Sequence, residues 1–317
     1  MKLDHTTRLF EGFSYLEFGL SAPRQGIKRV YDLRTESKAY DWFMHARYSN
    51  DLYAYLTMSG ALQNQDLGLA AKVYQSEVHH PNDLILNLSK LVSLSLFDRP
   101  SFFEFGQTLF GCIEGIDFAR NFLNHANVEF LGPEVNEILW YGFDISDFFN
   151  VFSRIMHPNQ RLVTTNVLND IPNSMSVFFA KGVTLLYAIQ TPADLFSLLE
   201  KSEFAIFDYS LSTKGDRTVK LETGKEVHFL DHANFCEAIN KLNVNLFVRE
   251  TAKRSDIDSK VTFECIVGAP SKCKEFQDLE RRTVSQLHSL VPVESQVLLG
   301  AYMEQQFNWT TLDRLLK

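Results

Sequence analysis

From residue 99 to residue 270, short apolar runs alternate with stretches of helical periodicity. The runs have the length and composition of buried strands, and the stretches between them place apolar side chains three to four residues apart. This alternation predicts an α/β fold, in which parallel βαβ units form one sheet with helices on both faces. The predicted strands cover residues 101–105, 138–144, 161–165, 175–180, 204–210, 245–249 and 261–267, and the predicted helices cover 111–125, 146–157, 192–201 and 232–242.

The last two predicted strands break the alternation. Residues 251–259 between them are polar and charged, which predicts a loop and not a helix. Two strands that are joined without a helix should pair antiparallel. The sequence therefore predicts a Rossmann-like, mostly parallel sheet of seven strands that ends in an antiparallel hairpin.

The chain on either side of this region is predicted to be helical. Apolar positions recur at helical spacing over residues 37–96, where one helix is expected to begin with Asn82 or Asp83 as its N-cap. Two amphipathic helices divided near Pro292 are predicted from residue 275 to residue 317. This divides the chain into a helical N-terminal region (1–98), an α/β domain (99–270) and a helical C-terminal tail (271–317).

Composition narrows the classes of function. The formal net charge of −8 at pH 7 disfavours general binding to nucleic acids or anionic membranes, which need a surplus of Lys and Arg. No apolar stretch reaches the length of about eighteen residues that a membrane span needs, and no secretory signal is visible. The four scattered cysteines are expected to be buried small hydrophobes, which favours a reducing cytoplasmic location and no metal site. They are Cys112, Cys236, Cys265 and Cys273.

Candidate binding residues follow the first two predicted strands, because ligands of open parallel sheets bind at the carboxyl ends of the strands. The first strand runs into Glu104-Phe-Gly106, where a glycine lets the backbone approach a ligand beside a helix N-terminus. The second ends at Asp144, whose carboxylate is placed to accept hydrogen bonds from two ribose hydroxyls. Gly106 alone could form any tight turn, and Asp144 could merely cap a helix. Together they describe an adenosine pocket.

These two strand ends, residues 177–187 and the closing hairpin resemble the class I S-adenosylmethionine (SAM)-dependent methyltransferases. The resemblance covers roughly residues 99–270 and rests on architecture plus short degenerate motifs. The family loop usually runs acid-x-Gly-x-Gly-x-Gly, and here Thr108 and Phe110 stand where the later glycines would be.

The resemblance implies SAM as the cofactor and gives roles to the residues at the strand ends. The first acidic-glycine loop would hold the methionine part, the acid after the second strand the ribose, the residues around the second and third strand ends the adenine, and the fourth strand end the transferred methyl group. In this chain Glu104, Gly106 and Thr108 would hold the methionine part, and Asp144 would hold the ribose. Ile145 and Asn166 would lie at the adenine, and Ala180 and Lys181 at the transferred methyl group.

The chemistry expected of such a site is modest, because a sulfonium methyl is already activated and the enzyme mainly aligns the acceptor and excludes water. A hydroxyl acceptor also needs a general base. The candidates are His228 and His232 after the fifth strand, with Lys181 as a charge that orients the acceptor. For each histidine the sequence favours a structural role over a catalytic one, His232 as the start of the next helix and His228 as a surface residue.

The sequence therefore predicts methylation of a small-molecule acceptor, with oxygen favoured over nitrogen as the acceptor atom. The N-terminal helices are expected to form a lid over the acceptor, a homodimer interface, or both. Two alternatives stay open. One is a catalytically inactive methyltransferase-like scaffold or partner subunit, and the other is an NAD-dependent oxidoreductase, which the missing G-x-G-x-x-G spacing disfavours.

Overall fold

The computed structural model describes residues 83–106, 116, 119–120, 123–124, 127–130, 132–144, 161–180, 184–220, 226–250, 260–290 and 309–316. The N-terminal helices predicted before residue 83, with their lid or dimerisation role, lie outside these residues. So do the helix predicted at 146–157 and most of the helix predicted at 111–125.

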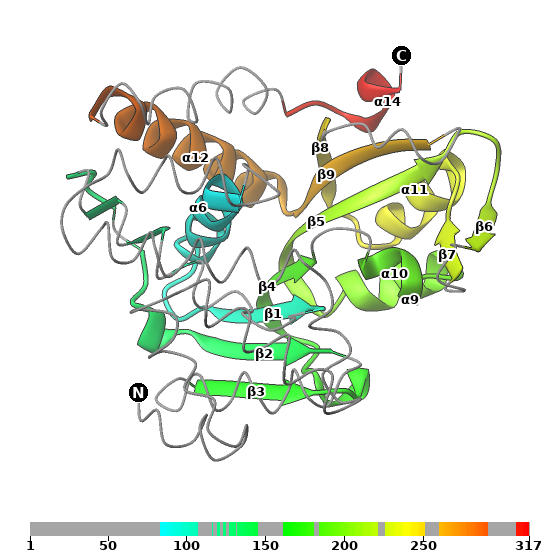
Figure 1. Ribbon diagram of the computed structural model, residues 1–317, viewed down its shortest axis with the longest axis horizontal. Helices are drawn as coiled ribbons and strands as arrows, with labels where there is room; N and C mark the ends of the chain where they lie inside the picture. The colour runs from blue at the N-terminus through cyan, green and yellow to red at the C-terminus, as the bar shows by residue number, and fades with distance from the viewer. Residues whose placement is uncertain are drawn as a thin grey trace, which may run out of the picture.

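A single seven-stranded sheet forms the centre of the described chain, in the order β3-β2-β1-β4-β5-β9-β8 (Figure 1). Strand β9 is antiparallel to both of its neighbours, β5 and β8, and the other neighbouring strands of this sheet pair parallel. The fold and its closing antiparallel hairpin are thus confirmed, and every predicted strand is present with its ends within two residues. The strands are β1 (Ser101–Phe105), β2 (Leu139–Phe143), β3 (Arg161–Thr165), β4 (Met175–Ala180), β5 (Ser202–Ser212), β8 (Asn245–Glu250) and β9 (Lys260–Gly268).

Helices cover both faces of the central strands, as is usual for parallel sheets. Phe102 of β1 packs in one core with α6 (Asp83–Leu94) and α12 (Pro270–Leu290), and we call this side the α6 face. Phe103 packs in the opposite core with α9 (Thr184–Ala188), α10 (Pro192–Leu199) and α11 (His232–Lys241), which we call the α10 face. Figure 1 shows α6 and α12 side by side, well apart from α9, α10 and α11.

Local signals explain where these helices begin. The described part of helix α6 begins at Asp83, and Asn82, the other N-cap candidate, lies outside the described residues. Thr191 caps α10 by accepting a hydrogen bond from the Asp194 N–H, and Pro192 occupies the first turn. Helix α12 starts at Pro270, which corrects the predicted start at residue 275, because proline is well suited to a first helical turn. None of the described helices is long and apolar enough to cross a bilayer.

The connection between β3 and β4 contains only a 3₁₀ turn, Leu168–Asp170. A buried lysine, Lys201, holds this short crossover by donating hydrogen bonds from Nζ to the Ile171 carbonyl (3.1 Å) and to Asn173 Oδ1 (2.8 Å). Val163 on β3 stays 43% exposed.

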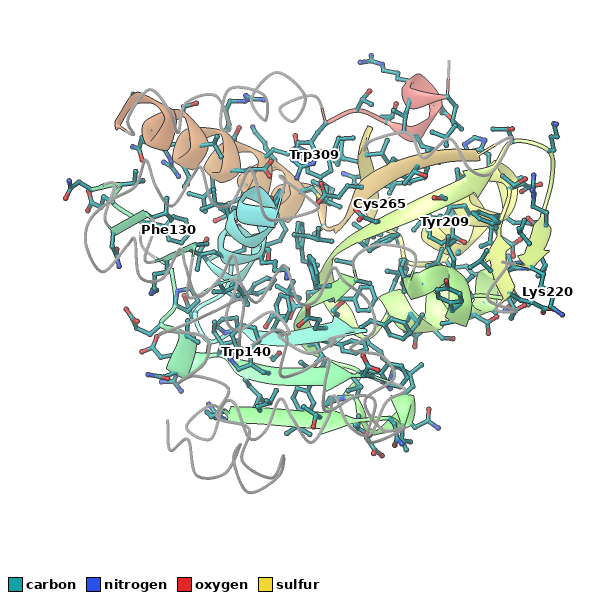
Figure 2. The ribbon with its side chains drawn as sticks, in the orientation of Figure 1. Phe130, Trp140, Tyr209, Lys220, Cys265 and Trp309 are labelled. Atoms are coloured by element: carbon teal, nitrogen blue, oxygen red, sulfur yellow. The ribbon has the colours of Figure 1, made fainter. Side chains whose placement is uncertain are left out.

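A β-hairpin and a short α-helix in the described part of the chain were not predicted from the sequence. The first is a hairpin of β6 (Arg217–Lys220) and β7 (Glu226–Phe229), where the sequence suggested a loop carrying candidate bases. Figure 2 shows Lys220 on this hairpin, at the edge of the molecule (Figure 2). The second is the five-residue helix α9, which follows β4. Both are too short for hydrophobic periodicity to reveal.

A network of buried charges ties together β8, β9 and α12. Arg249 of β8 is 2% exposed and pairs with Glu264 of β9 and with Glu280 of α12, the latter at 3.0 Å. Its guanidinium lies 4.2 Å from the ring of Trp309, whose indole N–H donates to Glu280 Oε2 (3.0 Å). Ser89 of α6 adds a hydrogen bond of 2.8 Å to Glu280 Oε1. The network lies on the α6 face, where Ser89 of α6 and Trp309 both contact Glu280, and Figure 2 shows Trp309.

The described cysteines are all reduced. Cys265 and Cys273 are buried, as predicted, and burial raises the pKa of the Cys273 thiol to about 12. Cys236 is only partly buried, because it lies on α11 at the border of the α10-face core, which corrects the prediction of full burial. Cys112 lies outside the described residues.

Candidate functional site

The carboxyl ends of β1 and β2 meet at one edge of the sheet. Phe105 of β1 pairs with Phe143 of β2, so that the residues that follow them, Gly106 and Asp144, stand side by side. The Gly106 N–H donates to the Phe143 carbonyl (2.8 Å), and the Asp144 N–H donates to the Thr165 carbonyl at the end of β3 (3.1 Å). The structure therefore brings together the two residues that the sequence singled out for an adenosine pocket.

Gly106 turns the chain sharply at the end of β1. Its φ of 72° lies in the left-handed region, which glycine adopts without the steric cost that a Cβ would impose. The turn lies at the point where the sheet order reverses, with β2 on one side of β1 and β4 on the other. Thr108, two residues further on, lies outside the described residues.

Glu104 precedes this turn by two residues and faces the same core as Phe102. Its side chain is 12% exposed, and its carboxylate lies 3.8 Å from the ammonium of Lys90 on α6. The Lys90 Nζ also lies 4.2 Å from the centre of the Phe179 ring on β4. The Glu104 carboxylate is therefore paired with the buried ammonium of Lys90 on the α6 face.

Asp144 and Asn166 follow β2 and β3 at the same edge but differ in burial. Asp144 is 6% exposed, which places a carboxylate within the protein surface at the end of β2. Asn166 is exposed, directly after Thr165 at the end of β3. Ile145, the predicted neighbour of the adenine, lies outside the described residues.

Ala180 is the last residue of β4 and is 1% exposed. Its side chain belongs to the core of the α10 face, and its backbone stands level with Phe105 of β1. Lys181, which follows, lies outside the described residues.

His228 lies on β7, directly opposite Thr218 of β6. Its Nδ1 is 2.8 Å from Thr218 Oγ1. Its Nε2 is buried, and no hydrogen-bond partner for it is found in the part of the chain that the structure describes. Strand β7 packs against α9, which begins four residues after the end of β4.

His232 has structural partners. It is the first residue of α11, and Asp231 caps this helix by accepting a hydrogen bond from the Asn234 N–H (2.9 Å). The His232 Nε2 lies 3.3 Å from a carboxylate oxygen of Asp313, on α14 (Leu312–Leu315). The histidine therefore contacts the C-terminal segment.

Sequence reasoning missed Lys90, Thr218 and Asp313, which contact the predicted site residues Glu104, His228 and His232. Lys90 had one visible signal, because it is the only lysine or arginine in the sequence of α6. Thr218 had none, since the hairpin itself was not predicted. In the described ranges no cluster of His, Cys, Asp or Glu could hold a metal ion.

Comparisons with known proteins give similarity to solved structures only. No protein-family model matches the chain, and no curated protein matches its sequence. The N-terminal domain of EvdMO1, solved in the presence of SAH and D-fucose, is 12% identical with a TM-score of 0.42, over 65% of this chain and 97% of that one. A SAM-dependent methyltransferase from Clostridium acetobutylicum ATCC 824 is 10% identical with a TM-score of 0.41, over 65% and 98%. The glycopeptide N-methyltransferase MtfA is 8% identical with a TM-score of 0.33, over 54% and 89%.

The strand order defines the class of fold. A parallel sheet with the order β3-β2-β1-β4-β5, completed by an antiparallel β9 inserted beside β8, is the sheet of the class I SAM-dependent methyltransferases. The chain has this Rossmann-like fold.

Proposed function

We propose that the chain is a SAM-dependent methyltransferase that acts on a small-molecule acceptor, with oxygen as the favoured acceptor atom. The observation that carries this proposal is the left-handed turn at Gly106 beside the buried Asp144. Both lie where the sheet order reverses, the position at which open α/β sheets bind nucleotide-type ligands.

The residues at this edge fit the cofactor. A buried carboxylate at the end of β2 is suited to two ribose hydroxyls, and Glu104 offers a negative charge for the ammonium of the methionine part. Gly106 has no side chain, so a ligand can approach the backbone closely at this position. The proposal also includes Thr108 at the methionine part, Ile145 and Asn166 at the adenine, and Ala180 and Lys181 at the methyl group.

When bound, SAM supplies a methyl group that its sulfonium already activates. The chain's own residues then have to hold the acceptor in line and keep water away. His228 is the favoured base, because a Thr218 contact at Nδ1 leaves Nε2 to accept a proton from an acceptor hydroxyl. His232 is the weaker candidate, since its Nε2 faces Asp313.

Isothermal titration calorimetry tests the proposal with SAH, the demethylated product of SAM. We expect micromolar binding to the wild-type chain and a loss of about tenfold or more for Asp144→Asn, because a ribose hydrogen bond to a charged acceptor is lost. Asp278→Asn, an exposed acid on α12, is the matched control and should bind SAH as the wild type does. If the wild type binds neither SAH nor SAM, the proposal is refuted.

A catalytically inactive methyltransferase-like subunit is the second candidate, favoured by Thr108 and Phe110 in place of the family's glycines. It predicts SAH binding without turnover on any acceptor, or a stable heteromeric partner in a pull-down. An NAD-dependent oxidoreductase would instead bind NADH in a fluorescence titration. Light scattering tests the homodimer that we propose for the N-terminal helices.

A further inference from the structure

Lys90 lies at an unusual place for a lysine. It is 5% exposed, on the side of α6 that packs against the sheet, between the core residues Leu88 and Leu91. Removal of an ammonium from water is costly unless the charge is paired. The structure therefore has to supply a reason for this charge in the α6-face core.

The contacts of Lys90 span the two central strands. Its Nζ lies 3.8 Å from Glu104 Oε1 on β1 and 4.2 Å from the centre of the Phe179 ring on β4. Glu104 and Phe179 are direct partners in the β1–β4 register. Lys90 thus lies across the strand pair at which the sheet order reverses, just below the Gly106 turn.

A carboxylate buried as deeply as Glu104 needs a countercharge to stay ionised and in place. Lys90 supplies that charge from α6, and its ammonium also makes a cation–π contact with the Phe179 ring. The carboxylate is then set before any ligand arrives, which spares a binding event the cost of ordering it.

We propose that Lys90 is a positioning residue for the cofactor, acting through Glu104: it holds this carboxylate at the start of the Gly106 turn, where the cationic methionine part of SAM would meet it. This inference rests on the proposed function. It adds a residue from outside the strand ends and makes α6 part of the cofactor site.

The test compares Lys90→Met, Lys90→Arg and Glu104→Gln by calorimetry with SAH and by thermal unfolding. We expect Lys90→Met and Glu104→Gln each to weaken SAH binding by about tenfold or more, because each breaks a buried charge pair. Lys90→Arg keeps the charge and the cation–π contact, so its affinity should stay within about threefold of the wild type. In the double variant, Lys90→Met should weaken binding no further than Glu104→Gln alone.

Lys272→Met is the matched control. The Nζ of Lys272 lies 4.3 Å from the Phe97 ring and donates to the Leu96 carbonyl, so it is also a lysine over a phenylalanine on the α6 face. Its loss should lower the melting temperature and leave the affinity for SAH unchanged. If Lys90 had only a structural role, Lys90→Met would likewise lower the melting temperature and leave the affinity for SAH unchanged.

The outcomes separate this inference from the proposed function. If the wild type does not bind SAH, the proposed function fails. If the wild type binds SAH and a folded Lys90→Met variant binds it equally well, the inference fails and the proposed function stands. If Lys90→Met does not fold, the double variant decides, because it removes both charges: an affinity more than about threefold below that of Glu104→Gln overturns the inference.

Discussion

Gly106 and Gly215 offer a residue-level test of the turn at the end of β1. Both have positive φ, 72° and 88°. An alanine in the left-handed region costs about 1–2 kcal/mol, so each Gly→Ala variant should lose about that much free energy of unfolding in urea. Only Gly106→Ala should also weaken SAH binding, because Gly215 lies in the turn between β5 and β6.

Open space around Gly215 sharpens this comparison. A Cβ built on Gly215 meets no atom within 4 Å, so its variant reports the backbone strain alone. Equal losses of SAH affinity in both variants would show that the effect of Gly106→Ala comes from general destabilisation and not from the site.

At the level of single elements, Arg249 connects β8 to β9 and to α12 through buried ion pairs. It compensates Glu264 on β9 and Glu280 on α12, all three being almost fully buried. Arg249→Met leaves two buried carboxylates without their countercharge, which should lower the free energy of unfolding by about 3–5 kcal/mol. Urea unfolding at pH 7 measures this.

The control for this prediction is Arg249→Lys, which keeps the charge but not the two separate nitrogens, Nε and Nη1, with which the guanidinium contacts Glu264 and Glu280. It should lose less stability than Arg249→Met. If the two variants unfold alike, the shape of the guanidinium and not its charge is what β8 needs.

The same network predicts a pH dependence. Burial raises the pKa of Glu264 above its ordinary value of 4.5, a shift that Arg249 opposes. Because the folded state holds the proton more tightly than the unfolded state, the stability from this group is complete below pH 4.5 and is lost as the pH rises through the raised pKa. The free energy of unfolding of the wild type should therefore fall relative to that of Glu264→Gln as the pH rises above 4.5.

Urea unfolding at several pH values measures this difference. Titrations elsewhere in the chain are common to both proteins and cancel in the comparison. A difference that grows with pH would mean that the attraction of Arg249 outweighs burial and lowers the pKa of Glu264.

At the level of the whole molecule, a cofactor that binds only the folded chain should raise its melting temperature. At a concentration of about 100 times the dissociation constant, linkage gives roughly 2.7 kcal/mol of stabilisation. For a chain of this size that corresponds to an increase of about 4 °C. We expect this shift with SAH in a thermal melt of the wild type, and about half of it or less for Asp144→Asn. The same shift in both proteins would contradict the place of Asp144 in the site.

The sheet could be predicted from the sequence because its strands are apolar runs that differ sharply from their surroundings, as Phe102 and Phe103 show on β1. The strand ends then place Gly106 and Asp144 together, since parallel strands share one edge. The hairpin of β6 and β7 could not be predicted, because Arg217-Thr-Val-Lys220 has a single apolar side chain.

Partners that depend on tertiary packing were beyond the sequence. Lys90 and Glu104 meet only because α6 folds back over β1, and no spacing rule joins them. Arg249 and Glu280 are brought together in the same way, by the docking of α12 on the sheet. Such pairs follow from the assembled core and not from periodicity.

Insertion of β9 between β5 and β8 sets an order of assembly. Nine register pairs join β9 to β5, and six join it to β8, which precedes it in the chain. A polypeptide that ends before Lys260 would therefore expose two open strand edges and leave Arg249 without Glu264. During synthesis on a ribosome, β8 has to wait for β9 before it can join the sheet, and chaperones that shield exposed strand edges would be needed most in that interval.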